Sequence, residues 1–161
     1  MEYRDFGNSG IKLSRIGLGC FGMSGAYGTA DDSESIATIH EAMEHGVNLI
    51  DTSARYGGGH NHRLIGKAIK GRREQVFIHS KTGTIRDESD RSVAAGSGAP
   101  DRLRDICETS LKNLGVDYLD TMCQSRVDPT IPIEESVGAV SRLVEEGKVR
   151  FVGLSEAAPN T

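Results

Sequence analysis

Short apolar runs alternate with longer segments of helical spacing along almost the whole chain of 161 residues. The short runs are rich in Val, Ile and Leu, which is typical of strands, and each longer segment has one apolar stripe, which is typical of a helix packed on one side. Strands that alternate with helices pair in parallel, because right-handed crossovers return the chain to the same edge of the sheet. The sequence therefore predicts an α/β sheet or a (β/α) barrel.

The expected order is a short hairpin followed by β(αβ)4. The hairpin strands are predicted at 3–6 and 11–13, on either side of the turn Asn8-Ser9-Gly10. The five further strands are predicted at residues 16–18, 47–50, 76–80, 118–124 and 149–154. The four helical stripes are predicted at residues 36–43, 64–69, 103–111 and 137–144.

Helix start and stop signals agree with this order. Asp32 and Ser33 are placed to cap the first helix, and Pro100 stands near the start of the third. A glycine follows every stripe, as expected where a helix ends; these are Gly46, Gly71, Gly115 and Gly147. The polar stretch 84–99 follows a strand and is predicted to be a long βα loop. Without a linker that divides the chain, we expect a single domain over residues 1–161.

Charge, hydropathy and cysteine count exclude several classes of protein. The 19 basic and 23 acidic residues are interleaved, giving a net charge of −4, so nucleic acid is not an expected partner. No apolar run approaches the ~18 residues of a membrane helix, and the polar N-terminus lacks a secretion signal. Three cysteines without CxxC spacing suit buried thiols in a reducing compartment rather than disulfides or zinc ligands. A cytoplasmic location is expected.

Residues 17–22 spell GxGxxG directly after a predicted strand, which is the dinucleotide fingerprint of doubly wound folds. In those folds the helix begins inside the motif, so that its N-terminus faces the pyrophosphate. Here the loop-like sequence MSGAYGTADDS follows at 23–33. The glycines are therefore better explained by a tight exit from the strand.

Three ionisable residues stand at or after the carboxyl ends of successive predicted strands. Asp51 follows the strand at 47–50, Tyr56 lies in the next loop, and Lys81 follows the strand at 76–80. In a parallel barrel this edge is the active face. A tyrosine is a poor acid at neutral pH, but a neighbouring ammonium favours the phenolate, and the ammonium in turn needs a carboxylate partner. Together they predict a general-acid site that protonates an oxygen as hydride reaches its carbon.

Five longer segments resemble the aldo-keto reductases, in particular the bacterial and plant branch that includes pyridoxal- and perakine-type reductases. The resemblance runs from about residue 3 to residue 158. It rests on the segments GLGCFGMSGAYG (17–28), GVNLIDTSARYGGGHN (46–61), VFIHSKTG (76–83), SLKNLGVDYLDTMCQSRVD (110–128) and PIEESVGAVSRLVEEGKVRFVGLSE (132–156). The DxxxxYG element and the strand-end lysine occur in the expected order.

This resemblance implies a (β/α)8 TIM-type barrel that binds NADP(H) and reduces an aldehyde or ketone. The family's catalytic Tyr, Asp and Lys fall on Tyr56, Asp51 and Lys81. Its substrate-orienting His falls on Ser125, within the run QSRVD. On the cofactor side, Ser155 matches the residue that contacts the nicotinamide carboxamide. Gly22 and Met23 match backbone contacts near the nicotinamide ribose, where Asp51 is also expected.

Two positions depart from the family pattern. Ser125 supplies a hydroxyl that can donate one hydrogen bond, but it lacks the charge and the reach of an imidazole. His62 stands where the family commonly has Glu, in the run His60-Asn61-His62. Without a third ligand at suitable spacing, we expect no metal there and interpret this run as polar residues on the surface.

Length leaves three hypotheses open. A complete barrel needs ~250 residues, so the chain is predicted to be a barrel truncated to about its first half. It is either the N-terminal half of an NADP-dependent carbonyl reductase, a catalytically inactive remnant acting as a binding module, or a half-barrel that self-associates. Self-association is expected at the open edges formed by residues 16–18 and 149–154.

Overall fold

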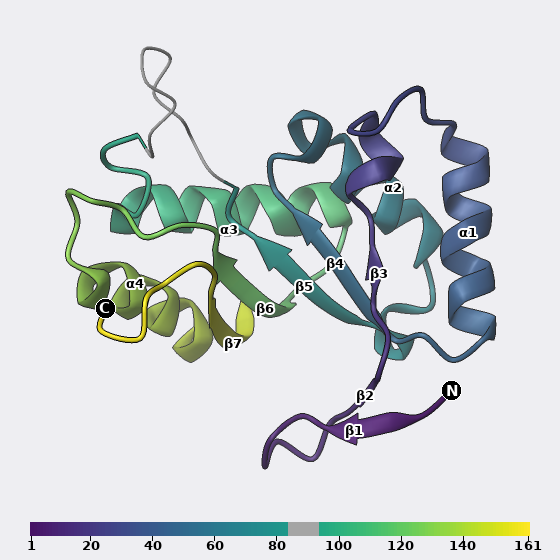
Figure 1. Cartoon of the computed structure of the whole chain (residues 1–161), viewed down its shortest axis with the longest axis horizontal. Coiled ribbons are helices and arrows are strands. Elements are labelled where there is room, and N and C mark those ends of the chain that lie inside the picture. Colours follow the sequence, from purple (N-terminus) through teal and green to yellow (C-terminus); the bar gives the residue numbers. More distant parts are fainter. Residues whose placement is uncertain (84–93) are drawn as a thin grey trace.

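Five parallel strands form a single curved sheet in the computed structural model, which describes residues 1–83 and 94–161 (Figure 1). Their order in the sheet follows their order in the chain. They are β3 (Leu18–Gly19), β4 (Leu49–Ser53), β5 (Phe77–Lys81), β6 (Leu119–Gln124) and β7 (Val149–Leu154). A doubly wound fold reverses its strand order at a switch point, whereas a barrel does not. The barrel-type prediction is therefore confirmed, and the GxGxxG run is not a dinucleotide-binding turn of that kind.

Four helices cover the outer face of the sheet (Figure 1). They are α1 (Asp32–Glu44), α2 (His60–Ala68), α3 (Pro100–Leu114) and α4 (Ile133–Glu145). Three short 3-10 turns lie between these elements: η1 (Phe21–Ser24), η2 (Tyr56–Gly59) and η3 (Arg73–Gln75). Among the described residues, no helix has the length and apolar character needed to cross a membrane.

The hydrophobic core lies between this outer face and the helices. Ile50, Ile78 and Met122 project from β4, β5 and β6 and are at most 1% exposed. They belong to the same buried cluster as the apolar stripes of the helices, including Ile39, Ile65, Leu103, Cys107, Val140 and Leu143. Cys20 and Cys123 are also buried free thiols, so the interpretation of the cysteines as small buried residues is confirmed. Burial raises the pKa of the Cys20 thiol to about 12.

The N-terminal hairpin lies beside the end of the sheet at which the parallel strands begin (Figure 1). Its strands are β1 (Tyr3–Asp5) and β2 (Lys12–Ser14), which pair in antiparallel fashion. Phe6 meets Phe77 and Phe151 edge-on, with ring centroids 5.2 and 5.0 Å apart. The Ser14 amide donates to Asn48 Oδ1 over 2.8 Å, just before β4. The hairpin thus covers the apolar side chains at the bottom of the inner face.

Several predicted boundaries are wrong by a few residues. The first parallel strand is Leu18–Gly19 rather than 16–18, because Ile16 is 65% exposed and its carbonyl accepts from Ser14 Oγ. Strand β4 is Leu49–Ser53 rather than 47–50, because Asp51, Thr52 and Ser53 pair with β5. The predicted loop 84–99 lies outside the described residues over 84–93.

The end signals of the helices are mostly correct. All four helix-closing glycines have a φ between +66° and +83°, the left-handed region that favours glycine. Pro100 is the first residue of α3. The N-cap of α1 is Asp31, not Asp32 or Ser33, because the Asp31 side chain accepts from the Glu34 amide over 2.9 Å.

Candidate active site

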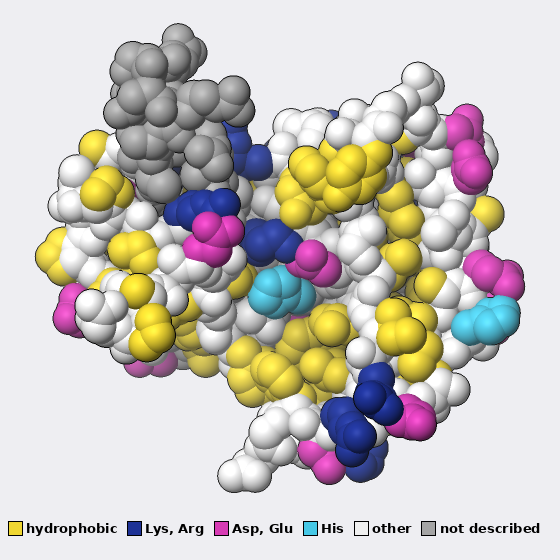
Figure 2. Space-filling model, in the orientation of Figure 1, with side chains coloured by type: hydrophobic (Ala, Val, Ile, Leu, Met, Phe, Trp, Pro, Cys, Tyr) yellow, Lys and Arg dark blue, Asp and Glu magenta, His cyan; other side chains and the backbone are white. Residues whose placement is uncertain are grey.

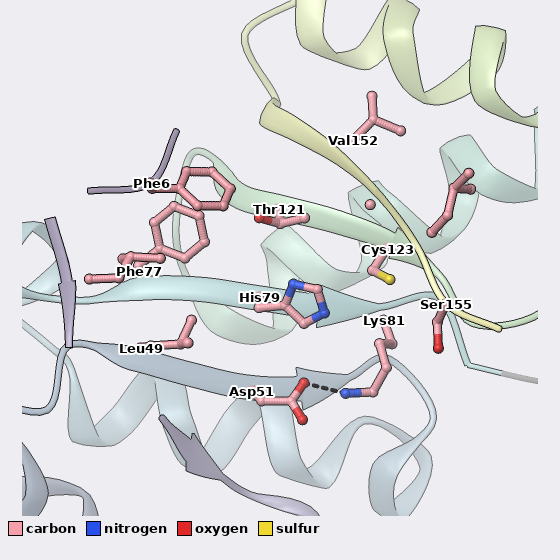
Figure 3. Close-up of a pocket in the computed structure, with 13 residues that line it drawn as sticks. Phe6, Leu49, Asp51, Phe77, His79, Lys81, Thr121, Cys123, Val152 and Ser155 are labelled. Atoms are coloured by element: carbon pink, nitrogen blue, oxygen red, sulfur yellow. Dashed lines mark hydrogen bonds and ion pairs between the residues drawn. The ribbon is translucent and has the colours of Figure 1, made fainter. Parts of the chain in front are cut away.

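Period-two alternation of side chains brings three ionisable residues to the inner face of the sheet. Asp51 pairs in register with His79, and Ser53 with Lys81, on the parallel neighbours β4 and β5. Asp51, His79 and Lys81 all line a cavity of about 610 Å³ over this face (Figure 3). The part of the cavity near the start of the strands is apolar and contains Phe6, Leu49 and Phe77. Figure 2 shows charged and histidine side chains beside hydrophobic ones in this hollow.

Lys81 links two of the predicted catalytic residues. Its ammonium donates a hydrogen bond to Asp51 Oδ1 and lies 5.7 Å from the centroid of the Tyr56 ring. Asp51 lies within β4 rather than after it, so its backbone is fixed by the sheet on both sides. The structure therefore brings Asp51, Tyr56 and Lys81 together, as the sequence predicts.

Tyr56 is the first residue of η2 and lies three residues after the end of β4. Gly57 and Gly58 follow it with φ of +56° and +59°, and a Cβ on Gly57 would come within 2.9 Å of the Ser24 Cβ. The absence of a side chain at Gly57 thus allows η1 and η2 to pack closely, and the ring centroid of Phe21 lies 4.6 Å from that of Tyr56. Phe21 is a site residue that the sequence analysis missed, since an apolar residue after a strand predicts core as readily as site.

A second cavity, of about 380 Å³, adjoins the tyrosine. It is lined by Tyr56, Lys81, Ser125 and Ser155, which come from four separate segments of the chain. Ser155 and Lys81 also line the larger cavity of the inner face. The further lining residues are Phe21, Ser53, Arg55, Gly83, Arg126 and Glu156. An aromatic wall and several polar groups thus converge on one space, which is typical of a small-molecule site.

Ser125 lies at this cavity but is only 8% exposed. Its hydroxyl oxygen accepts a hydrogen bond from the Gly83 amide over 2.7 Å, and its own amide donates to Thr82 Oγ1 over 3.1 Å. Ser125 therefore ties the segment after β6 to the segment after β5. Arg126 extends this connection, because its guanidinium forms an ion pair with Glu156 after β7.

The predicted cofactor residues are not all found together. Ser155 lines both cavities that contain Lys81, whereas neither Gly22 nor Met23 lines either of them within the described part of the chain. Both belong to η1, and Met23 packs partly against the hydrophobic core.

The run His60-Asn61-His62 was predicted to consist of polar residues on the surface, and that prediction is wrong. It forms the first turn of α2, and Asn61 and His62 are fully buried against the sheet. His62 Nε2 lies 3.0 Å from Ser80 Oγ on the outer face of β5. Burial, with a smaller contribution from Arg63, lowers the pKa of His62 to about 4. Over residues 1–83 and 94–161, no group of three potential ligands is placed to hold a metal.

His79 is a further inner-face residue that the sequence analysis did not select. Burial is the main cause of its lowered pKa, and Asp51 and Lys81 act on it in opposite directions. The signal that could have found it is its spacing, two residues before Lys81 in the same strand.

A family model described as the aldo/keto reductase family matches residues 15–161. The chain belongs to this family. It is 42% identical over 158 residues to a probable aldo-keto reductase 1 of Glycine max, with 96% of this chain and 45% of the relative covered. Among solved structures, it is similar to an aldo-keto reductase of Bacillus halodurans in its holo form, with a TM-score of 0.84 and 29% identity. That match covers 99% of this chain and 52% of the other.

A second aldo-keto reductase structure, from Klebsiella pneumoniae, is a complex with NADP and acetate. It has a TM-score of 0.75 and 31% identity, over 92% of this chain and 48% of that one. The chain thus spans about half the length of these relatives. Its curved sheet and four helices match about half of an aldo-keto reductase (β/α)8 barrel.

Proposed function

We propose that the protein contributes the catalytic face of an NADP(H)-dependent reductase that converts an aldehyde or ketone to an alcohol. The observation that carries this proposal is the arrangement around the second cavity. Tyr56 and Lys81 both line this second cavity, and the Lys81 ammonium donates a hydrogen bond to Asp51. Membership of the aldo/keto reductase family and the NADP-bound relative support the cofactor.

In this proposal Tyr56 is the catalytic acid. Its hydroxyl donates a proton to the carbonyl oxygen as negative charge develops there. Lys81 stabilises the phenolate that remains, and Asp51 holds the Lys81 ammonium in place. Ser125 is the residue at the position of the family's histidine, but its hydroxyl already accepts from Gly83, which leaves one O–H to orient the carbonyl.

The polar side chains of the two cavities fit the carboxamide group of a nicotinamide cofactor. The Ser155 side chain stands where the two cavities meet, and its hydroxyl can bond a carboxamide group. NADPH, when bound, supplies the hydride. Ser155 and Asp51 would hold its nicotinamide half, with the backbone of Gly22 and Met23 as further contacts on the side of η1.

A test is to measure NADPH-dependent reduction of a panel of aldehydes by the chain and by Tyr56→Phe. Loss of the acid should lower kcat by at least about 10²-fold. Tyr118→Phe is the matched control, because its hydroxyl donates to Glu74 and is remote from both cavities. Equal turnover of Tyr56→Phe and wild type would remove Tyr56 from this role.

We further propose that residues 1–161 act as one partial barrel domain in the cytoplasm. Strands β3 and β7 are the edges of the described sheet, and Val152 and Leu154 are 38% and 48% exposed. Such edges favour pairing with a second copy. Residues 1–161 span about half the length of the relatives, and barrels usually bind phosphate after their seventh and eighth strands, so a preparation of these residues should bind NADPH no tighter than high micromolar. Sub-micromolar binding by a strict monomer, measured by fluorescence titration and light scattering, would contradict this proposal.

The alternative is a catalytically inactive member of the family that serves as a binding module. The hydrogen bond from Gly83 to Ser125 favours it, because it gives the hydroxyl oxygen a structural role in joining two segments. Measurable NADPH binding without reduction of any aldehyde, by both wild type and Tyr56→Phe, would favour this alternative.

A further inference from the structure

Ser24, His60 and Asp32 form a hydrogen-bonded row outside the site of Tyr56. Ser24 Oγ lies 2.9 Å from His60 Nδ1, and His60 Nε2 lies 2.8 Å from Asp32 Oδ1. The three residues come from the end of η1, the start of α2 and the start of α1. A hydroxyl, an imidazole and a carboxylate in this order are the parts of an activated serine nucleophile.

Asp32 fixes the direction of these hydrogen bonds, and Asn61 adds a further donor to Ser24. The Asn61 amide nitrogen donates to the Cys20 carbonyl over 2.8 Å and to Ser24 Oγ over 2.9 Å. The Asp32 carboxylate can only accept, so in the neutral ring of His60 the proton is on Nε2 and is donated to Asp32. His60 Nδ1 is then the acceptor of the Ser24 hydroxyl proton. The tautomer is the one in which His60 can take the proton of Ser24.

The row borders a cavity of its own, of about 340 Å³. Ser24, Asp32 and His60 line it together with Gly25, Gly28, Gly57, Met23, Thr29 and Ala30. The backbone amides of Gly28, Thr29 and Ala30 donate no hydrogen bond to another described residue, so they are available as donors to a ligand. None of Tyr56, Lys81 and Ser125 lines this cavity.

We propose that this cavity is a second catalytic site, in which Ser24 accepts the acyl group of a small carboxylic ester. Its volume lies at the low end of the range for small-molecule sites, which suits a short acyl chain. His60 is the general base, and Asp32 holds its ring and stabilises the imidazolium that forms. This activity needs no nicotinamide cofactor, although its cavity shares Met23 with the cofactor contacts of the proposed reductase.

The proposed reaction has two steps. Ser24 Oγ bonds to the ester carbonyl carbon while its proton passes to His60 Nδ1. The bond from that carbon to the alkoxy oxygen then breaks, and the alcohol leaves with the proton from His60. In the second step water attacks the acyl-serine, again with His60 as base, and releases the carboxylic acid and free Ser24. Water is the only co-reactant.

The first experiment measures hydrolysis of p-nitrophenyl acetate, without any nicotinamide cofactor, and the site of acetylation by peptide mass spectrometry. We expect acetylated Ser24 in wild type, and hydrolysis at least about 10²-fold slower in both Ser24→Ala and His60→Gln. Ser33→Ala is the matched control, because Ser33 is exposed on the first turn of α1 and is not among the described residues that line the cavity. Acetylation elsewhere, or unchanged hydrolysis by Ser24→Ala, would overturn the proposal.

A second variant keeps the test decisive if Ser24→Ala does not fold. Ser24→Cys retains a side chain of similar size beside His60, and the three native thiols are buried. A base-activated thiol should react with iodoacetamide at least about tenfold faster than that of Ser33→Cys, and adding His60→Gln should remove the difference. Equal rates at positions 24 and 33 would show that His60 does not activate this position.

Discussion

The two faces of the β4–β5 pair satisfy their polar side chains in opposite ways. On the outer face, Thr52 Oγ1 donates to the buried Asn61 over 2.7 Å, and Ser80 Oγ lies 3.0 Å from the buried His62. On the inner face, Asp51 and Lys81 bond to each other beside an open cavity. Residues adjacent in the same strand therefore have different tasks, because side chains alternate between the faces.

Outer-face residues therefore contribute mainly to stability, and inner-face residues mainly to the chemistry of the cavity. Outer-face side chains are closed off by α2, so their replacement leaves a cavity or an unpaired polar group. Inner-face side chains retain exposure to a cavity, so their replacement removes chemical groups at a smaller cost in folding. Substitutions at neighbouring positions of one strand can test this distinction.

The largest effect on stability is expected for Ile78→Ala. Ile78 is fully buried on the outer face of β5, and loss of its side chain should lower the free energy of unfolding by about 2–5 kcal/mol. His79→Ala, one residue later on the inner face, should cost less than about 1 kcal/mol. Urea unfolding followed by circular dichroism measures both. Equal losses for the two variants would show that the faces do not differ in this way.

The next effect is a loss of stability in acid that depends on His62. Its pKa is about 4 in the folded protein against an ordinary 6.5, so the unfolded chain binds the proton more readily. This contribution is complete above pH 6.5 and is lost as the pH falls toward 4, by up to about 3 kcal/mol.

His62→Gln should flatten the dependence of unfolding free energy on pH between 6.5 and 4. His45→Gln is the control, because the His45 side chain is 72% exposed. Urea titrations at several pH values distinguish them. If His62→Gln keeps the wild-type slope, His62 is not the group that is protonated on unfolding.

The order of elements could be predicted because it depends on local periodicity. All seven strands and four helices occur where alternating and helical patterns place them, within a few residues. The ends of β4 could not be predicted, because Asp51 to Ser53 are polar and become strand only by pairing with β5. Tertiary partners override local preference at such positions.

Residues of the candidate site could be predicted where they follow strands in the sequence. Residues whose position depends on tertiary packing could not. Asp51, Tyr56 and Lys81 meet because parallel strands end at one edge of the sheet. The burial of Asn61 and His62 could not be predicted. Their buried partners are the hydroxyls of Thr52 and Ser80, and a polar run in the sequence does not indicate that such partners exist. The row of Ser24, Asp32 and His60 joins residues from three segments, which spacing along the chain cannot reveal.

A smaller effect on the inner face is expected for Ser125→His. An imidazole reaches further into the cavity than a hydroxyl, so it should raise kcat/KM for aldehyde reduction by up to about tenfold, or ~1.4 kcal/mol. The gain is limited because the bond from the Gly83 amide to Ser125 is lost. Steady-state kinetics beside Ser125→Ala, which should not gain, measure it. No gain for histidine would mean that Ser125 serves only to join its two segments.

The smallest effect is expected at the N-cap of α1, on the helical layer remote from the inner cavity. The Asp31 carboxylate accepts from the Glu34 amide over 2.9 Å, so Asp31→Ala should cost about 1 kcal/mol and lower Tm by roughly 2–4 °C. Asp31→Asn retains an acceptor oxygen and should recover most of this loss. Ser33→Ala should leave Tm unchanged, because Ser33 lies inside the first turn and is not the cap. A larger loss for Ser33→Ala than for Asp31→Ala would mean that Ser33 is the N-cap in solution and that the helix begins two residues later.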